Sequence, residues 1–528
     1  MRRKVILLVC LASLFLAGTS CREQPDSSGD VPALLDSLEH KLAWLDYRLG
    51  LEEWNLQTSG RADSLEFYRD LYCYVVSDAG AFNTLRHAGS RITDDVDRRR
   101  WQIAYGRLAL GRIEGESAIS GLRDSLAAVA GNFRPEFEGA PSDAALVRQT
   151  YRTDQNTTRR ELAYRAWVSV GFEVANGLER LMRLRNHEAR KYGYNNFLAM
   201  VFNRLDLKSS DYLALLRQLD ASTERPYREI IDSLKRALNM DYIEIWDVPF
   251  AFSNIDRQVD AYFPADSQLP FIQRSLAAIG FDLDKLPVYL DLQTGLDRQE
   301  LTRAFLIKAP YDARIAADLA GGHDRTAALM RQIGRAIGFI HIKQEQPFFN
   351  IHVDDCWSEA TGDLIASLTA DRAWLEEYAG IPTALLSKYL EARKQQDIID
   401  LRTLLLRLHF EYEAYTNPNR DLNRLYWDLF ERYLLLPRHD DLQPWAALAA
   451  YVTQPVYLQN YLYADMVVAQ TLSFLEKNYG RVTDNPTTGS FLVQNYLRFG
   501  GRYDWRELVR RGTDEELNPQ YLTQRLGI

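Results

Sequence analysis

The sequence predicts an all-α protein with at most a minor β element. Only 29 Gly and 18 Pro occur among 528 residues, and so few turn formers favour long helices over many short strands. Hydrophobic residues make up 46% of the chain, which is enough for a large core. From Pro32 onward, apolar side chains recur at spacings of three and four, the period of one helix face. The alternation typical of half-buried strands is scarce, and residues 242–252 are the best candidate for a short extended segment.

The N-terminus is typical of an export signal. Residues 2–4 are Arg-Arg-Lys, and residues 5–17 form an apolar run that is too short to span a membrane. The small residues 18–20 then precede Cys21, which resembles the bacterial lipobox, where the chain is cleaved and the Cys is lipidated. Gly18 departs from the Leu that is usual at that position. The alternative is an ordinary secreted protein with a coincidental Cys.

The predicted organisation is a signal peptide over residues 1–20, a flexible tether over residues 21–34 and one helical domain over residues 35–528. Pro, Ser and Gly in the tether are typical of a mobile linker. A lipid on Cys21 predicts a protein anchored to a membrane of the cell envelope, on the periplasmic side or the cell surface. The net charge of −9 argues against a nucleic-acid partner.

Helical periodicity predicts the elements of the domain in order. The first helix carries an apolar stripe formed by Leu34, Leu38, Leu42, Leu45 and Leu49. Further helices are predicted over residues 161–191, 210–238, 325–342, 371–391, 398–415 and 453–479. Gly193 and Gly480 mark the ends of two of them. No internal repeat and no second linker is found, so one helical body with two lobes is the simplest architecture.

Two neighbouring segments place opposite charges on apolar helices. Residues 327–342 are small or apolar nearly all round, apart from an early cluster of Arg331, Gln332 and Arg335. The two Arg residues are four apart and share one helix face. Glu359 and Asp363 are also four apart in the next segment. Because buried Arg is rare unless paired, ion pairing between the segments is one hypothesis. Separate solvated charges are the other.

The spacing of these residues resembles the angiotensin-converting-enzyme family of zinc metallopeptidases, a gluzincin family. In that family a helix carries His-Glu-x-x-His, in which the two His bind zinc and the Glu is the general base. Twenty-four residues later comes a Glu ligand inside His-Glu-Ala-x-Gly-Asp. Here Glu359 lies 24 residues after Arg335, inside Ser-Glu-Ala-Thr-Gly-Asp. The resemblance implies a two-lobed helical clamshell with a deep central cleft.

Three other stretches support the resemblance, which covers about residues 35–510. Residues 185–194 resemble a helix end of bacterial members, and residues 304–314 resemble the segment before the zinc helix. Residues 455–461 resemble the segment that brings a Tyr to the reacting carbonyl, which implies that Tyr457 and Tyr461 are retained site residues together with Glu359 and Asp363.

The departures from the family pattern predict a degenerate site. Arg331 and Arg335 stand at the two His positions, and a guanidinium has no lone pair to give to a metal. Gln332 stands at the position of the general base and cannot accept a proton from water. Residues 445–455 hold no His, although active relatives keep one just before the Tyr. We therefore expect no bound zinc, no other cofactor and no functional catalytic residue.

Other groups in the chain do not form a substitute site. His187-Glu188 begins like the zinc motif, but Lys191 stands where the second His belongs. His341 and His352 have the pattern of structural histidines, and no Gly-rich phosphate loop or nucleophile elbow is present. Besides Cys21, the mature chain would keep only two thiols, Cys73 and Cys356, and the sequence does not decide whether they pair.

Three functions remain in view. The first is an inactive metallopeptidase homologue, tethered to a membrane, that binds a peptide or protein in its cleft or acts as a scaffold. The second is an active peptidase or dipeptidyl carboxypeptidase with an atypical site. The third is a nutrient-binding surface lipoprotein of the helical, glycan-capturing type, which would contain tandem helical hairpins.

Overall fold

The structure is a computed structural model in which residues 31–292 and 302–528 are described. The predicted signal peptide and Cys21 lie outside the described residues. So does most of the predicted tether. The first described helix, α2 (Val31–Ser59), begins inside the stretch predicted as tether, four residues before the expected start of the domain. Pro32 lies in its first turn, where its missing N–H costs nothing.

The helices of the first half of the chain follow α2 in order. They are α3 (Leu65–Val76), α4 (Ala79–Ala88), α5 (Asp95–Glu114), α6 (Ser117–Asn132), α7 (Ala144–Thr153), α8 (Thr157–Val168), α9 (Val170–Lys191), α10 (Phe197–Arg204), α11 (Ser209–Leu238), α12 (Val248–Asp260) and α13 (Ala265–Ala278). The predicted helix over residues 161–191 is therefore two helices, which meet at Ser169. The helix predicted over residues 210–238 is confirmed as α11.

The second half of the chain holds the helices on which the site is built. They are α14 (His323–Ile340), α15 (Pro347–Ile351), α16 (Asp355–Ala366), α17 (Arg372–Glu377), α18 (Thr383–Thr416), α19 (Leu422–Leu434), α20 (Ala450–Thr453), α21 (Gln459–Tyr479), α22 (Pro486–Asn495), α23 (Trp505–Thr513) and α24 (Gln520–Arg525). The predicted helix over residues 325–342 is confirmed as α14.

The predicted break near residues 392–397 is wrong. α18 runs unbroken through them, since Ala, Lys and Gln are strong helix formers. The break lies instead between α17 and α18, where Pro382 precedes the first residue of α18. A Pro disfavours helical backbone in the residue before it, so it ends one helix and starts another.

The strands lie elsewhere than predicted. Residues 242–252 are not extended, because Pro249 sits in the first turn of α12 and starts a helix there. The described strands are β1 (Glu136–Phe137), β2 (Ala140–Pro141), β3 (Val288–Leu292), β4 (Thr302–Lys308) and β5 (Asp312–Ala317). β1 and β2 form a two-residue antiparallel pair, and the other three form a sheet in the order β3-β5-β4.

In the three-stranded sheet, β5 pairs in parallel with β3 and antiparallel with β4, which leaves β4 as an edge strand. Phe305 and Ile307 alternate inward from β4 and pack with Trp54 of α2 in a small separate core. β4 contacts α2 on one side and α14 on the other. The sheet is thus the minor β element that the sequence predicts, placed directly beside the site helix.

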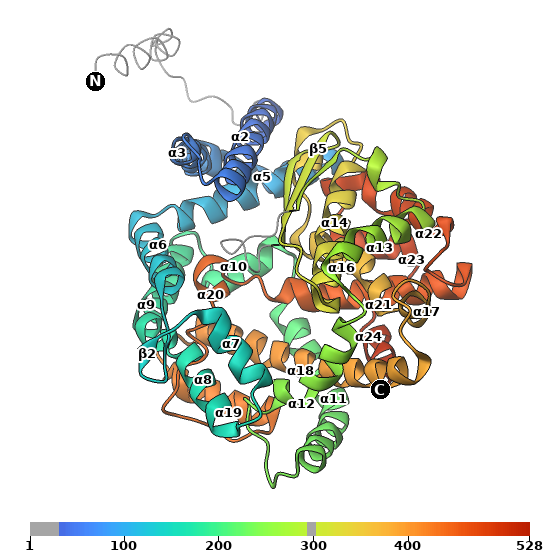
Figure 1. Cartoon of the computed structure of the whole chain (residues 1–528). Coiled ribbons are helices and arrows are strands. Elements are labelled where there is room, and N and C mark those ends of the chain that lie inside the picture. The colour runs from blue at the N-terminus through green and yellow to red at the C-terminus, as the bar shows by residue number, and fades with distance from the viewer. Residues whose placement is uncertain (1–30, 293–301) are drawn as a thin grey trace, which may run out of the picture.

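Figure 1 shows the helices in two groups. α6 and α9 lie on one side of the molecule, and α13, α14, α16 and α22 lie on the other, with the sheet at the top of the second group. The long helix α18 runs below α14 and α16. Within the described residues, no helix is both long enough and apolar enough to cross a bilayer. The predominantly helical, two-lobed fold class predicted from sequence is confirmed.

Candidate functional site: an ion-pair cluster on α14, α16 and α21

The site is built on the close crossing of α14 with α16. A Cβ atom added at Gly334 of α14 would lie 2.8 Å from the Cβ of Ile365 and 3.1 Å from the Cα of Gly362. A Cβ atom added at Gly362 would lie 3.0 Å from the side chains of both Arg331 and Arg335. Since the two backbones touch without intervening side chains, the polar residues that flank the crossing necessarily face one another.

Arg331 and Asp363 form the first ion pair across this crossing. The Nε atom of Arg331 lies 2.6 Å from Oδ1 of Asp363. Nη2 of the same guanidinium donates a hydrogen bond of 2.6 Å to Oδ2. The contact is therefore an ion pair with one hydrogen bond, since the Nε atom of Arg331 has no hydrogen-bond partner within the described residues. The side chain of Arg331 is 35% exposed and that of Asp363 18% exposed, so the pair is only partly buried and reaches solvent.

Arg335 and Glu359 form a looser second pair. Nη1 of Arg335 lies 3.9 Å from Oε1 of Glu359, beyond hydrogen-bond distance. The Nε atom of Arg335 donates instead to Oγ of Ser358, over 3.2 Å. Glu359 receives its short hydrogen bond, of 2.7 Å, from the hydroxyl of Tyr457. The structure therefore brings together the residues that the sequence singled out, but a Tyr supplies the closest partner of the buried carboxylate.

Gln332 turns toward the sheet. Its Oε1 atom accepts a hydrogen bond of 3.0 Å from the backbone N–H of Ala304 in the edge strand β4. The side chain at the general-base position of the family pattern is thus engaged with a strand. A carboxamide has no basic site with which to take a proton from water. This residue holds the sheet against α14.

The site is completed by α21 and the turn before it, and α21 packs directly against α16. Tyr461 lies with its ring centroid 6.0 Å from the guanidinium of Arg331 and meets the ring of Tyr457 edge-on. Asp465 lies one further turn along the same face of α21, and it was not predicted from the sequence as a site residue. Burial raises the pKa of Asp465 to about 8, and Asp363 acts in the same direction. The signal in the sequence was the spacing of four from Tyr457 to Tyr461 to Asp465.

A strained turn fixes the position of Tyr457. The helix predicted over residues 453–479 is broken by residues 454–458, where Val456 adopts a φ of 55°. For a β-branched residue this left-handed backbone is unfavourable. Its N–H donates a hydrogen bond of 2.7 Å to Oε1 of Glu411 on α18, and its carbonyl accepts one of 2.7 Å from Gln459. Glu411 thereby holds the turn that presents Tyr457 to Glu359.

The remaining candidates from the sequence lie outside the site. Arg185 and Asn186 are structural, since Arg185 pairs with Glu114 at 2.7 Å and Asn186 bonds to the backbone of Tyr415 and Phe197. His187 is exposed on α9. His341 bonds to a carbonyl in its own helix, and burial lowers the pKa of His352. Cys73 and Cys356 are both free thiols, which answers the question that the sequence left open.

The donor set of the site does not fit a zinc ion. Zinc sites need three or four side chains with free lone pairs, chiefly His, Cys, Asp or Glu. The site offers two fixed cations, and its two nearest carboxylates already face them. Within residues 31–292 and 302–528, no group of three or more His, Cys, Asp or Glu side chains is arranged to hold a metal ion. The arrangement can instead bind polar groups through guanidinium, phenol and carboxyl side chains.

Comparison with known proteins supports the fold. No family model matches the chain, and no curated protein matches its sequence. Among solved structures, PZ peptidase A with an inhibitor matches with a TM-score of 0.69 and 14% identity over 97% of each chain. A protein assigned as an oligoendopeptidase F matches with a TM-score of 0.67 and 14% identity over 96% of each chain. The chain thus has a helical zinc-peptidase-like fold. Neither structure bears the name of the angiotensin-converting-enzyme family.

Replacing Glu359 by Ala is expected to destabilise the protein by about 1–3 kcal/mol. A fully buried pair that loses one partner costs about 3–5 kcal/mol, but Arg335 is 27% exposed and can regain water. The remaining cost comes from the hydroxyl of Tyr457, which loses its acceptor. Chemical denaturation of both proteins measures the difference. Tyr457→Phe, which removes the same hydrogen bond from the other side, is the matched control. A fully neutral Glu359→Ala would show that the cluster contributes nothing.

Glu411 is expected to make stability depend on pH. Its carboxyl is 3% exposed, and burial raises its pKa to about 7 from 4.5, although the N–H of Val456 acts in the opposite direction. The folded protein therefore binds a proton that the unfolded chain has released, and stability falls as pH rises from about 4.5 to 7. At about 1.4 kcal/mol for each pKa unit, this loss is about 2–4 kcal/mol. Glu411→Gln, which keeps the acceptor, should remove this part of the pH dependence in urea unfolding at pH 5 and pH 8. An unchanged pH profile would contradict the assignment.

Proposed function

We propose that the chain is a catalytically inactive homologue of the zinc metallopeptidases that binds a ligand in its cleft. One observation carries the proposal: Arg331 and Arg335 occupy the metal-ligand positions of the family pattern and face Asp363 and Glu359. An Arg side chain cannot ligate a metal, and two of them repel a dication. Gln332 cannot replace the general base. Neither zinc nor any other cofactor is part of this proposal.

The relation to the angiotensin-converting-enzyme family belongs to the same proposal. It is supported by the spacing of 24 residues from Arg335 to Glu359 and by Tyr457, which donates its hydroxyl to Glu359. The likeness to the two solved peptidases is one of fold, at 14% identity. The finer assignment therefore rests on the motif residues.

The proposed setting is the bacterial cell envelope, with a lipid on Cys21. The basic residues 2–4, the short apolar run and the small residues before Cys21 support it. The proposed partner is a peptide or protein ligand, and its polar groups would meet the partly exposed side chains of Arg331 and Arg335. Mass spectrometry of the mature N-terminus tests the anchor, and an intact Met1 or an unmodified Cys21 would refute it.

The two rival functions predict different observations. An atypical peptidase or dipeptidyl carboxypeptidase requires a second catalytic constellation. A glycan-capturing lipoprotein predicts tandem helical hairpins. The chain instead matches peptidase structures along 96–97% of its length. This likeness favours a protein related to peptidases over a glycan-capturing lipoprotein.

The decisive experiment is metal analysis of the purified protein together with a broad peptide-cleavage screen, with and without chelator. We expect less than stoichiometric zinc and no chelator-sensitive cleavage. A peptidase of the same fold that has an intact His-Glu-x-x-His motif serves as the positive control for both assays. One zinc per chain, or cleavage that a chelator abolishes, would overturn the proposed inactivity and favour the atypical peptidase.

A further inference from the structure

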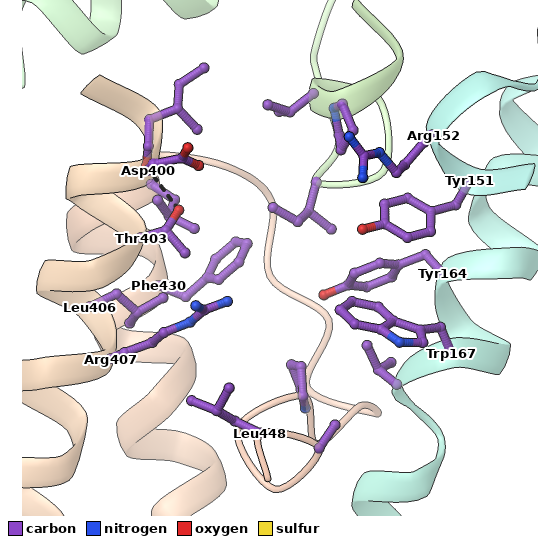
Figure 2. Close-up of a pocket in the computed structure, with 18 of the residues that line it drawn as sticks. Tyr151, Arg152, Tyr164, Trp167, Asp400, Thr403, Leu406, Arg407, Phe430 and Leu448 are labelled. Carbon is purple, nitrogen blue, oxygen red and sulfur yellow. Dashed lines mark hydrogen bonds between the residues drawn. The ribbon is translucent and has the colours of Figure 1, made fainter. Parts of the chain in front are cut away.

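A cavity of about 390 Å³ lies below the ion-pair site, between α7 and α8 on one side and α18 and α19 on the other (Figure 2). Its volume is within the range of about 300–1,000 Å³ that is typical of small-molecule pockets. Asp324, in the first turn of α14, also lines it. Arg331 follows seven residues later on the same helix, so at a rise of 1.5 Å per residue the cavity begins about 10 Å from the ion pairs.

One wall of the cavity is aromatic. The rings of Tyr151 and Trp167 stack with centroids 5.5 Å apart, and Tyr164 meets Tyr151 edge-on at 6.1 Å. Figure 2 shows the hydroxyl oxygens of Tyr151 and Tyr164 directed into the cavity. Across the described parts of the chain, neither hydroxyl has a hydrogen-bond partner. The wall therefore offers a flat apolar surface for a ring and two free phenol groups beside it.

The opposite wall carries charge on one face of α18. Asp400 and Arg407 are seven residues apart, and Figure 2 shows Arg407 reaching across the cavity toward Tyr164 and Trp167. Within residues 31–292 and 302–528, neither side chain has an ion pair or a side-chain hydrogen bond. Burial raises the pKa of Asp400, and Asp397 acts in the same direction. A guanidinium without a partner, aimed into a cavity, is a binding group for a carboxylate.

Most of the other charged side chains of the cavity already have a partner, but among the described residues Oδ1 of Asp256 is buried without one. Arg393 lies 3.2 Å from Asp324, and Asp256 accepts a hydrogen bond of 3.3 Å from Gln396. Arg152 stands on the aromatic side, opposite Asp400 in Figure 2. The groups left for a ligand are therefore the guanidinium groups and the carboxyl oxygens of Asp400 and Asp256. This pattern suits a ligand that has an anionic group for a guanidinium beside a ring for the aromatic wall.

We infer that this cavity binds a small aromatic carboxylate. The ring lies on the wall of Tyr151, Tyr164 and Trp167, and the carboxylate binds Arg407. A free aromatic amino acid and the last residue of a short peptide both offer this chemistry. The inference rests on the proposed ligand-binding function and names the ligand class.

Titration of the purified full chain with four probes tests the inference. The probes are L-phenylalanine, L-phenylalaninamide, 3-phenylpropanoate and Ala-Phe, measured by calorimetry and by the tryptophan fluorescence of the chain, to which Trp167 and Trp445 in the cavity lining contribute. We expect at least one of L-phenylalanine and Ala-Phe to bind, and the better of the two identifies the source as amino acid or peptide end. The amide, which lacks the carboxylate, should bind at least tenfold more weakly than L-phenylalanine where the amino acid binds. 3-Phenylpropanoate, which keeps the ring and the carboxylate, should bind more tightly than the amide. Equal binding of amide and acid, or no binding of either acid, would overturn the inference.

Substitutions of Arg407 and Trp167 test which side chains contact the ligand. Arg407→Gln should lower affinity for the bound acid at least tenfold and leave affinity for its amide unchanged, while Arg407→Lys should recover part of the loss. Trp167→Leu should weaken acid and amide alike. The matched control is Arg225→Gln, because Arg225 is 90% exposed on α11 and lies away from the cavity. Equal losses for acid and amide in Arg407→Gln would refute direct contact with the carboxylate.

The same samples separate this inference from the proposed function. Ala-Phe is recovered after incubation with the protein, and mass spectrometry shows whether the dipeptide is intact or cleaved. Intact dipeptide with affinity that depends on Arg407 supports both. Cleaved dipeptide with the same dependence refutes inactivity and leaves the cavity assignment standing. Intact dipeptide whose binding is insensitive to Arg407 and Trp167 refutes the cavity assignment alone.

Discussion

The variant that combines Arg331→His, Gln332→Glu and Arg335→His is expected to bind one zinc ion per chain, whereas we expect the unaltered protein to bind none. The two imidazoles would stand four residues apart on α14, and Glu359 already faces this helix from α16. Two His and one Glu with an open fourth position form a known zinc-site type. The crossing at Gly334 keeps the backbones at a fixed distance, so no helix has to move. The expected change is from no measurable affinity to a dissociation constant in the micromolar range or below.

Metal analysis after dialysis and competition with a chromogenic chelator measure this change. The triple variant with Glu359→Gln added is the control, and it should lose most of the affinity because one ligand is removed. Peptide cleavage is not expected to return with the metal, since residues 445–455 hold no His to assist Tyr457. A triple variant that stays free of zinc while its circular dichroism is unchanged would contradict the assignment of these positions to the family motif.

Gly334→Ala is expected to destabilise the protein by about 2–4 kcal/mol. The new methyl group would meet the Cβ of Ile365 at 2.8 Å and the backbone oxygen of Thr361 at 3.0 Å. Neither contact can be relieved by turning a flexible side chain, so α14 and α16 must separate. Overpacking of this kind costs about 1–3 kcal/mol, and more where backbone has to shift. This loss exceeds the gain of up to about 1 kcal/mol from replacing Gly inside a helix.

Gly121→Ala supplies the matched control. Gly121 also lies inside a helix, α6, but a Cβ atom there has no neighbour within 4 Å. Without a clash, the helix-propensity gain should stand alone, and the variant should be more stable by up to about 1 kcal/mol. Urea unfolding of the two variants therefore moves in opposite directions. A stabilised Gly334→Ala would show that the helices are not in backbone contact.

The core of the fold could be predicted from sequence because its helices follow their local pattern. In α2, the residues Leu35, Leu38, Leu42 and Leu45 are buried along one face, close to the predicted stripe. The strands could not be predicted, since β4 and β5 are only six or seven residues long and three of the four buried residues of β5 are Ala, which has no preference for strands. Their burial comes from packing against α2 and α14, which no local pattern encodes.

The residues that form the site could be predicted from the sequence, but the contacts between them could not. The spacing between Arg335 and Glu359 identified the helix pair, and the structure places the four charged residues across one crossing. The short bond from Tyr457 to Glu359 depends on the left-handed turn at Val456 and on Glu411, which is distant in sequence. The cavity of Figure 2 was not predicted, because it joins residues of α7, α8 and α18 that are far apart along the chain.

The backbone contact between Gly334 and Gly362 also bears on how such a protein can evolve. Because Gly334 meets Thr361, Gly362 and Ile365 and none of the side chains at positions 331, 332 and 335, this part of the helix crossing does not depend on those three side chains. Selection can exchange metal ligands for ion pairs there, or reverse the exchange, without first rebuilding the scaffold. The chemistry of the site and the architecture that displays it are therefore free to diverge at different rates.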